Sequence, residues 1–299
     1  DMDAYDAGWP LNDTGNQNHG TMMAGLATFG DLGPLLESTG LVEVNHRLES
    51  VRIIPPAGSN PPDLYGVIVK ESVARIETKQ PEKLRSFCMA ITSDELMSRG
   101  KPSSWSAAID QICFNAEVHY ESRVFVVSAG NVRDLSSCNN YMDKCDVSQV
   151  EDPAQAWNAI TVGAHTEKNA ILDLSFDGWT PVADIGALSP VSRTSQMWQR
   201  QNWPIKPEIV MEGGNWAQSP DPNINYWDNT DDLSLLTTHH EPTNRQFGVI
   251  SGTSASTALA SKLIAEVQNQ YPEMWAETVR GLVVHSARWT PRMQEAIDS

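Results

Sequence analysis

Positive charge is scarce in this 299-residue sequence: 21 Lys and Arg residues stand against 38 Asp and Glu residues, a formal net charge of −17. Nucleic-acid binding depends on basic side chains that neutralise phosphates, so this balance argues against a nucleic-acid partner. Long apolar runs are lacking too, since runs such as Val124–Val127 are far shorter than the roughly 20 residues that cross a bilayer. We therefore expect a soluble globular protein with no membrane partner.

Cysteine is rare, and a start signal is missing. The first residues, Asp1 to Asp6, contain no initiator Met, basic region or apolar signal segment, so we expect a single domain, 1–299, that is an N-terminally truncated fragment of a longer protein. Four cysteines with no Cys-x-x-Cys pair favour a reducing compartment and a cytoplasmic location. Two interpretations of the thiols stay open: a Cys138–Cys145 bridge, or four free thiols with Cys88 and Cys113 in the core.

Helix and strand patterns alternate along the chain, which predicts an α/β fold with a mainly parallel central sheet. Strands are expected near Val51–Ile54, Leu84–Ile91, Arg123–Ser128, Asn158–Val162, Glu208–Met211 and Leu233–Thr237. Helices are expected near His19–Thr28, Leu64–Thr78, Ser103–Ala116, Ser254–Gln270 and Pro272–Ala287. Long loops are expected at Pro55–Pro62 and Gly213–Asp232. The second loop carries Trp216, Tyr226 and Trp227, which either cover core or pack over a site.

Several catalytic motifs are missing. The sequence contains no Gly-x-Ser-x-Gly, no Gly-x-x-x-x-Gly-Lys-Ser/Thr and no His-Glu-x-x-His, which argues against an α/β-hydrolase elbow, a P-loop and a zinc protease. His239, His240 and Glu241 are consecutive, and neighbouring side chains on an extended segment point to opposite faces. We therefore expect no metal site there, and no cofactor.

Three segments contain candidate catalytic residues when they are considered together. His19 is followed by Gly20-Thr21 at the start of an expected helix, and the apolar strand 125–128 continues into Ala129-Gly130-Asn131. Ser254 lies in a turn of small residues before a long helix, where free backbone N–H groups and the helix dipole stabilise an oxyanion. Taken singly, the three are ordinary: a helix-end His, a turn Asn and an N-cap Ser.

Their joint occurrence in this order resembles the subtilisin-like serine peptidases, the subtilases of peptidase family S8. The resemblance implies a three-layer α/β/α fold and endopeptidase activity through an acyl-enzyme on Ser254. It also implies that His19 is the general base and that Asn131 and the Ser254 N–H form the oxyanion hole.

The resemblance also implies where a peptide or protein substrate binds. Ala90, Ile91 and Thr92 resemble the strand that pairs with an extended peptide, and Ala129 and Gly130 resemble the wall of the specificity pocket. Two acidic residues nearby, Glu151 and Asp152, have two interpretations. They either favour a basic substrate side chain or are solvated surface carboxylates.

One departure from the family is large: the triad Asp is not found. Asp13-Thr14-Gly15 imitates the family's Asp-Thr-Gly, but it lies six residues before His19 and follows no buried strand, so Asp13 is a weak candidate. We expect the true Asp and its strand to lie upstream of residue 1. This chain is then a weak or inactive enzyme, with unpaired strand edges that favour self-association.

Other questions stay open from the sequence. Calcium binding is implied by the resemblance, but no Asp-rich loop has the required ligand spacing. Neither a propeptide nor a partner ATPase is specified. A second class of function also remains: a catalytically impaired pseudoprotease, or peptide-binding module, that holds an extended peptide along Ala90–Thr92.

Overall fold

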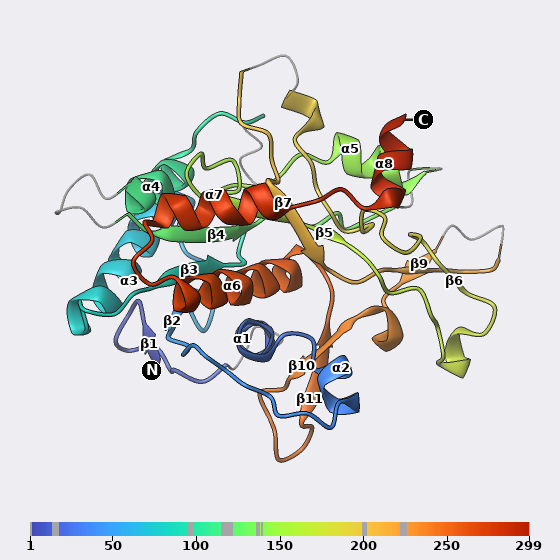
Figure 1. Ribbon diagram of the computed structural model, residues 1–299, viewed down its shortest axis with the longest axis horizontal. Coiled ribbons are helices and arrows are strands. Elements are labelled where there is room, and N and C mark those ends of the chain that lie inside the picture. The colour runs from blue at the N-terminus through green and yellow to red at the C-terminus, as the bar shows by residue number, and fades with distance from the viewer. Residues whose placement is uncertain are drawn as a thin grey trace.

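The computed structural model describes residues 2–13, 18–94, 99–114, 122–135, 138, 140–198, 202–221 and 226–298. Its centre is a four-stranded parallel sheet in the order β3-β4-β5-β7 (Figure 1). The strands are β3 (Ser86–Met89), β4 (Val124–Ser128), β5 (Ile160–His165) and β7 (Ile209–Glu212). All residues of β4 are buried, because helices cover both faces of this sheet.

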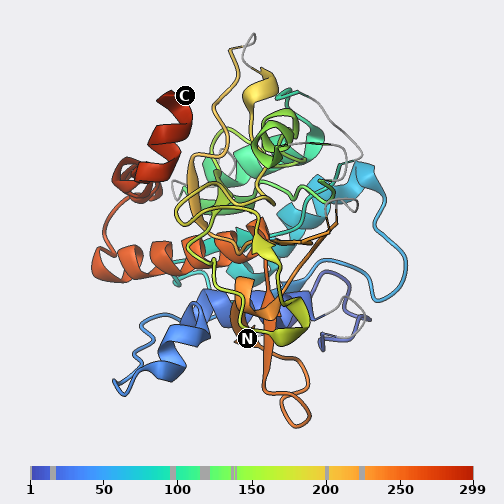
Figure 2. The same ribbon diagram turned by 90° about the vertical axis from the view of Figure 1, so that its right-hand side faces the viewer.

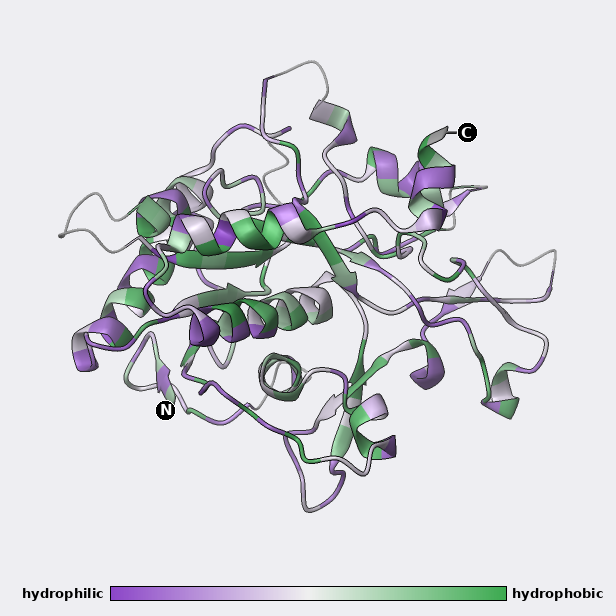
Figure 3. Ribbon diagram, viewed as in Figure 1, coloured by the Kyte–Doolittle hydropathy of each residue, from purple (hydrophilic) through white to green (hydrophobic). Residues whose placement is uncertain are grey.

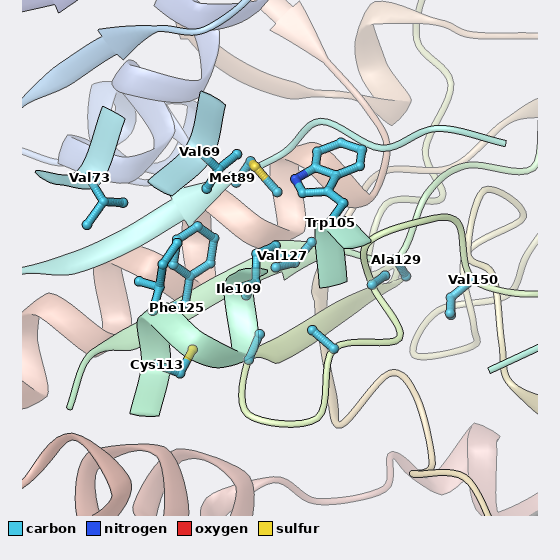
Figure 4. Close-up of a cluster of buried hydrophobic side chains, with 14 of the residues drawn as sticks. Val69, Val73, Met89, Trp105, Ile109, Cys113, Phe125, Val127, Ala129 and Val150 are labelled. Carbon is cyan, nitrogen blue, oxygen red and sulfur yellow. The ribbon is translucent and has the colours of Figure 1, made fainter. Parts of the chain in front are cut away.

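Alternate residues of β4 face the two helical layers. Val124 and Val126 pack on one side of the sheet. Phe125 and Val127 pack on the other side, in the cluster that Figure 4 shows. The first layer holds α6 (Thr253–Gln270) and α7 (Ala276–Ser286), and the second holds α3 (Tyr65–Lys79) and α4 (Ser104–Phe114). Each such apolar side chain contributes about 1.5–3 kcal/mol on burial. Figure 3 shows the apolar residues concentrated on these central strands. The architecture is the expected three-layer α/β/α fold.

Three smaller sheets lie around the central one. They are the parallel pair β1 (Met2–Ala4) and β2 (Ser50–Arg52), the hairpin β10 (Leu235–Thr238) and β11 (Phe247–Ile250), and the antiparallel sheet β6 (Thr180–Pro181), β8 (Ala217–Gln218) and β9 (Trp227–Asp228). Figure 2 shows the hairpin (orange) at the bottom of the molecule, near the blue N-terminal helices.

The remaining helices lie outside the two main layers. They are α1 (His19–Phe29), α2 (Leu32–Glu37), α5 (Tyr141–Val147) and α8 (Pro291–Asp298), with 3-10 turns η1 (Pro62–Leu64), η2 (Leu174–Phe176), η3 (Gln196–Trp198) and η4 (Asp231–Leu233). None of the helices in the described part of the chain has the length and apolar character needed to cross a membrane.

The cysteines correct one expectation. All four are free thiols, and Cys113 and Cys145 are buried. Cys88 lies on β3, the edge strand of the four-stranded sheet, and the residue is exposed there. Its thiol nevertheless is directed at α6, where Sγ donates to the Thr257 carbonyl at 3.9 Å, and burial raises the pKa of the thiol to about 11.

Candidate active site

His19 is the first residue of α1, and the hairpin β10–β11 holds this helix in place. The hydroxyls of Thr237 and Thr238 donate to carbonyl groups in the first turn of the helix, at 2.7 and 2.9 Å. Gly25 permits the close approach, because a Cβ there would lie 2.4 Å from both hydroxyl oxygens. The hairpin therefore fixes the helix and, with it, the position of His19.

The imidazole of His19 is half-buried, and this lowers its basicity. Burial lowers the pKa of His19 below its usual 6.5, and the negative charge of Asp13 acts in the opposite direction. The imidazolium form is disfavoured because a partly buried site solvates its charge poorly. The ring is therefore neutral near pH 7, the state that a general base needs.

Asp13 lies at the N-terminus of α1. Its Oδ2 atom accepts a hydrogen bond of 2.6 Å from the backbone N–H of Thr21, which is one of the N–H groups that a helix leaves unpaired at its start. Within the described residues, no hydrogen bond joins Asp13 to the His19 ring, and Asp13 stays a weak candidate for the triad acid. Thr14 and Gly15, which complete the Asp-Thr-Gly sequence, lie outside the described residues.

Asn131 follows the buried strand β4 and points its amide oxygen at the start of α6. Its Oδ1 atom accepts hydrogen bonds from the backbone N–H of Thr253 at 2.8 Å and from the Thr253 hydroxyl at 3.0 Å. Because both donors reach Oδ1, the Nδ2 group of the amide is left to donate elsewhere. Gly252, with φ +120°, allows this contact, since a Cβ there would lie 3.1 Å from the amide oxygen.

Ser254 is the second residue of α6 and is 8% exposed. Its hydroxyl donates to the carbonyl oxygen of Ala90 at 3.4 Å. At this helix start, backbone N–H groups lack intrahelical acceptors and the dipole is positive. The structure thus brings Ser254, Asn131 and Ala90 together, but among the described residues it shows no hydrogen bond between Ser254 and His19.

The expected peptide-binding segment, Ala90–Thr92, continues β3 beyond its last ladder pair. In the described part of the chain, no backbone–backbone hydrogen bond involves these three residues. Ser93, the next residue, pairs with Asp152 in an antiparallel bridge, with N···O distances of 2.8 and 3.1 Å. The segment is therefore anchored at its end and keeps backbone groups that an extended peptide can pair with.

Glu151 is buried, not a solvated surface carboxylate. It is 1% exposed, and its Oε1 atom lies 2.9 Å from Nη2 of Arg193 and 3.1 Å from Nη2 of Arg133. Its Oε2 atom accepts a 2.5 Å hydrogen bond from the Thr92 hydroxyl. Gly130 makes room for the carboxylate, because a Cβ there would lie 2.5 Å from it. Two guanidinium groups thus neutralise the charge of Glu151.

Asp152 is buried as well, at 3% exposed. Its carboxylate accepts hydrogen bonds from the Ser103 hydroxyl at 2.5 Å and from the Gln155 amide at 2.6 Å. Burial raises the pKa of Asp152, and the two hydrogen bonds oppose that shift. The interpretation of Glu151 and Asp152 as solvated carboxylates is therefore wrong for both residues.

Arg193 holds two backbone carbonyls next to the site, although no sequence motif contains it. Its Nε atom donates to the carbonyl of Asn131 at 2.9 Å, and Nη1 donates to the carbonyl of Gln149 at 3.0 Å. The hydrogen bond to the Asn131 carbonyl stabilises the turn that contains Asn131, and the ion pair with Glu151 neutralises the buried carboxylate. Because it lies 62 residues after Asn131 and in no motif, only the tertiary structure reveals this role.

No cluster of three or more His, Cys, Asp or Glu side chains suited to a metal ion is found in the ranges that the structure describes. His239 and His240 lie near α1, where Nε2 of His239 is 3.3 Å from the amide nitrogen of Asn18. His239 therefore contacts the residue that precedes His19.

Taken together, the fold and site are those of an α/β protein with a serine at a helix start and an amide beside it. The chain belongs to the subtilase family (Peptidase S8), whose model matches residues 1–298. It is thus a member of a family of serine peptidases with a subtilisin-like fold.

Solved structures of subtilisin-like proteins share the fold of this chain. The subtilase cytotoxin SubAB assembly matches with a TM-score of 0.56 and 19% identity, over 98% of this chain and 76% of that one. A cold-adapted subtilisin-like serine proteinase matches with a TM-score of 0.54 and 16% identity, over 94% and 73%. Sphericase matches with a TM-score of 0.52 and 20% identity, also over 94% and 73%.

A curated relative has no assigned function. The uncharacterized protein y4bN of Sinorhizobium fredii (strain NBRC 101917 / NGR234) is 26% identical over 208 residues, which is 66% of this chain and 47% of the relative. The chain therefore spans about half the length of this relative.

Proposed function

We propose that this chain is a serine endopeptidase domain that hydrolyses peptide bonds through an acyl-enzyme on Ser254. The observation that carries the proposal is the pair of hydrogen bonds from Thr253 to Oδ1 of Asn131. Because both bonds end on Oδ1, the N–H₂ group of Asn131 points away from Thr253. Ser254, the residue after Thr253, lies at the start of α6. Preorganised donors of this kind stabilise the oxyanion of a tetrahedral intermediate.

In the proposed reaction, the Ser254 oxygen attacks the peptide carbonyl carbon and gives its proton to neutral His19. The developing oxyanion accepts hydrogen bonds from Nδ2 of Asn131 and from the Ser254 N–H. His19 then returns the proton to the leaving amine, and water repeats the sequence to release the acid. At 3.4 Å the Ser254–Ala90 hydrogen bond is long, so rotation of the hydroxyl toward His19 loses little energy.

The proposed substrate is an extended peptide, paired with Ala90, Ile91 and Thr92. Ala129 and Gly130 follow β4, the strand that pairs with β3, and both are buried. The missing Cβ of Gly130 leaves room for the Glu151 carboxylate rather than for a substrate side chain. Main-chain pairing of this type supplies affinity with little dependence on sequence.

A peptide-binding module without cleavage is the second candidate. In its favour, the Ser254 hydroxyl is directed to Ala90, and among the described residues no carboxylate is hydrogen-bonded to His19. In subtilisin, loss of the triad acid alone lowers turnover by about 3 × 10⁴. We therefore expect slow catalysis from this chain.

Labelling with a fluorophosphonate separates the two functions. The chain, Ser254→Ala and His19→Ala are incubated with the reagent for hours, and adducts are located by intact mass and peptide mapping, with circular dichroism to confirm folding. The peptidase predicts an adduct on Ser254 that is absent in Ser254→Ala and slower in His19→Ala. A folded chain that binds peptide but forms no adduct contradicts the peptidase and supports the binding module.

A further inference from the structure

A pocket of about 370 Å³ lies beside the candidate active site and has no role in the mechanism above. Three aromatic rings line it, together with charged side chains from two separate segments. The lining includes Arg133, Asp134, Trp216, Tyr226, Trp227 and Asp228.

Both segments of the pocket wall connect to the reaction centre. Asn229, also in the wall, accepts a 3.0 Å hydrogen bond from the Ser251 hydroxyl, and Ser251 precedes Ser254 by three residues. Arg133 follows Asn131 by two residues. Because each residue of extended chain spans at most about 3.6 Å, the Cα atom of Arg133 lies within about 7 Å of that of Asn131, and the Cα atom of Ser251, the hydrogen-bond partner of Asn229, lies within about 11 Å of that of Ser254. A side chain near the scissile bond of a bound peptide can therefore reach the pocket.

The aromatic wall is held by packing. Trp216 and Trp227 pack against the buried Val132 and Leu135 of the loop that follows Asn131. Tyr226 is 50% exposed, and its ring meets that of Trp179 edge to face, with centroids 5.9 Å apart. Rings fixed in this way keep their faces and edges available to a ligand at little entropic cost.

The charge in the wall is negative. Arg133 is engaged elsewhere, with Nη1 at 2.5 Å from Asp94 and Nη2 at 3.1 Å from Glu151. Asp134 and Asp228 add two carboxylates, and the described residues include no ion-pair partner for Asp228. Aromatic faces combined with carboxylates attract cations and repel anions.

We propose that this pocket binds the positively charged side chain of a lysine or arginine in the substrate peptide. The long apolar stem of such a side chain packs on Trp216 and Trp227, and its cationic end faces Tyr226 and Asp228. The buried Glu151 does not provide this selectivity, because Arg133 and Arg193 neutralise it. The identification of the ligand as a substrate rests on the proposed function, whereas binding itself requires no cleavage.

Peptide binding to the Ser254→Ala variant tests the pocket without turnover. In a set of eight-residue fluorescent peptides, one lysine is moved through every position and compared with norleucine, which keeps the stem but lacks the charge. Dissociation constants are measured by anisotropy at low and high salt. We expect about fivefold tighter binding of lysine at one or two adjacent positions, and a smaller preference at high salt.

Two pocket variants and one control locate the effect. Asp228→Asn and Tyr226→Leu should each reduce the lysine preference about threefold. Asp177→Asn removes the same charge from an exposed residue outside the lining and should leave the preference intact. The proposal is overturned if lysine and norleucine bind equally at every position, or if both pocket variants keep the full preference.

Fluorophosphonate labelling of the unmodified chain keeps this result separate from the catalytic one. Labelling of Ser254 without a lysine preference retains the peptidase and overturns the pocket. A lysine preference without labelling retains the pocket as part of a peptide-binding module.

Discussion

Oδ1 of Asn131 lies 2.8 Å from the backbone nitrogen of Thr253, although 122 residues separate the two in the chain. This contact joins the end of β4 to the start of α6 and sets the orientation of the amide. The donor that remains, Nδ2, is the one that an oxyanion hole requires. The catalytic proposal depends on this contact more than on any other.

Replacement of Asn131 by Leu, which has nearly the same shape, removes the proposed donor. We expect the rate of Ser254 labelling, and of any peptide cleavage, to fall about 10²- to 10³-fold, as for the corresponding amide of subtilisin. Binding of an uncleaved peptide should change little. Asn244→Leu, at an exposed position in the β10–β11 loop, is the matched control, and equal rates in the two variants would rule out the oxyanion role.

Replacement by alanine should change the free energy of unfolding in opposite directions at two helical glycines. Gly25→Ala places a Cβ 2.4 Å from the hydroxyls of Thr237 and Thr238, so we expect a loss of about 1–3 kcal/mol in the free energy of unfolding. Gly281 in α7 has open space around it, and its replacement by alanine should add about 0.5–1 kcal/mol through better helix propensity. Urea denaturation of both variants measures this, and destabilisation by Gly281→Ala would contradict the packing described here.

Replacement of Asp13 by Asn distinguishes its two roles. As the acceptor for the Thr21 N–H at a helix start, Asp13 should contribute about 1 kcal/mol to stability, with little effect on labelling. Because its negative charge raises the pKa of His19, Asp13→Asn should lower that pKa further in an NMR titration. A fall in the labelling rate by several orders of magnitude, with stability unchanged, would instead identify Asp13 as the triad acid.

The pH dependence of labelling should report His19. Burial lowers its pKa below 6.5, so the neutral base persists to more acid pH and the rate should rise through a midpoint below 6.5. The unfolded chain binds the proton at higher pH than the folded one, so stability should decline as the pH falls below about 6.5. A rate profile with its midpoint at or above 7 would show that His19 is not the titrating base.

Glu151 and Arg193 form a buried ion pair, and loss of Glu151 leaves Arg193 without this counterion. Loss of Arg193 leaves Glu151 with Arg133 alone and removes the hydrogen bonds to the Asn131 and Gln149 carbonyls. Glu151→Gln and Arg193→Met should each destabilise the protein by about 3–5 kcal/mol. The double variant should lose less than the sum of the two. Glu266→Gln, which breaks the more exposed pair of Lys262 and Glu266, should cost less than about 0.5 kcal/mol. Comparable losses from the buried and exposed pairs would contradict the burial of Glu151.

The sequence predicted the main elements well where the local pattern was strong. The helix expected at Ser254–Gln270 is α6, Thr253–Gln270, and the strand expected at Arg123–Ser128 is β4, Val124–Ser128. It missed the short helices α2, α5 and α8 and the short strands β1, β6, β8, β9 and β11, and β8 and β9 lie in the segment Gly213–Asp232 that was expected to be a loop. Strands of two to four residues and helices of six to eight residues have too little periodicity to be recognised alone.

By itself, the sequence determined the α/β class and the three segments around His19, Asn131 and Ser254, because hydrophobic periodicity and small-residue turns are local properties. Only the tertiary structure decided which way the Asn131 amide points, that Arg193 neutralises Glu151, and that Cys88 lies at a sheet edge. Each of these depends on a contact between residues far apart in the chain, and burial and hydrogen-bond geometry at such contacts exist only once the chain has folded.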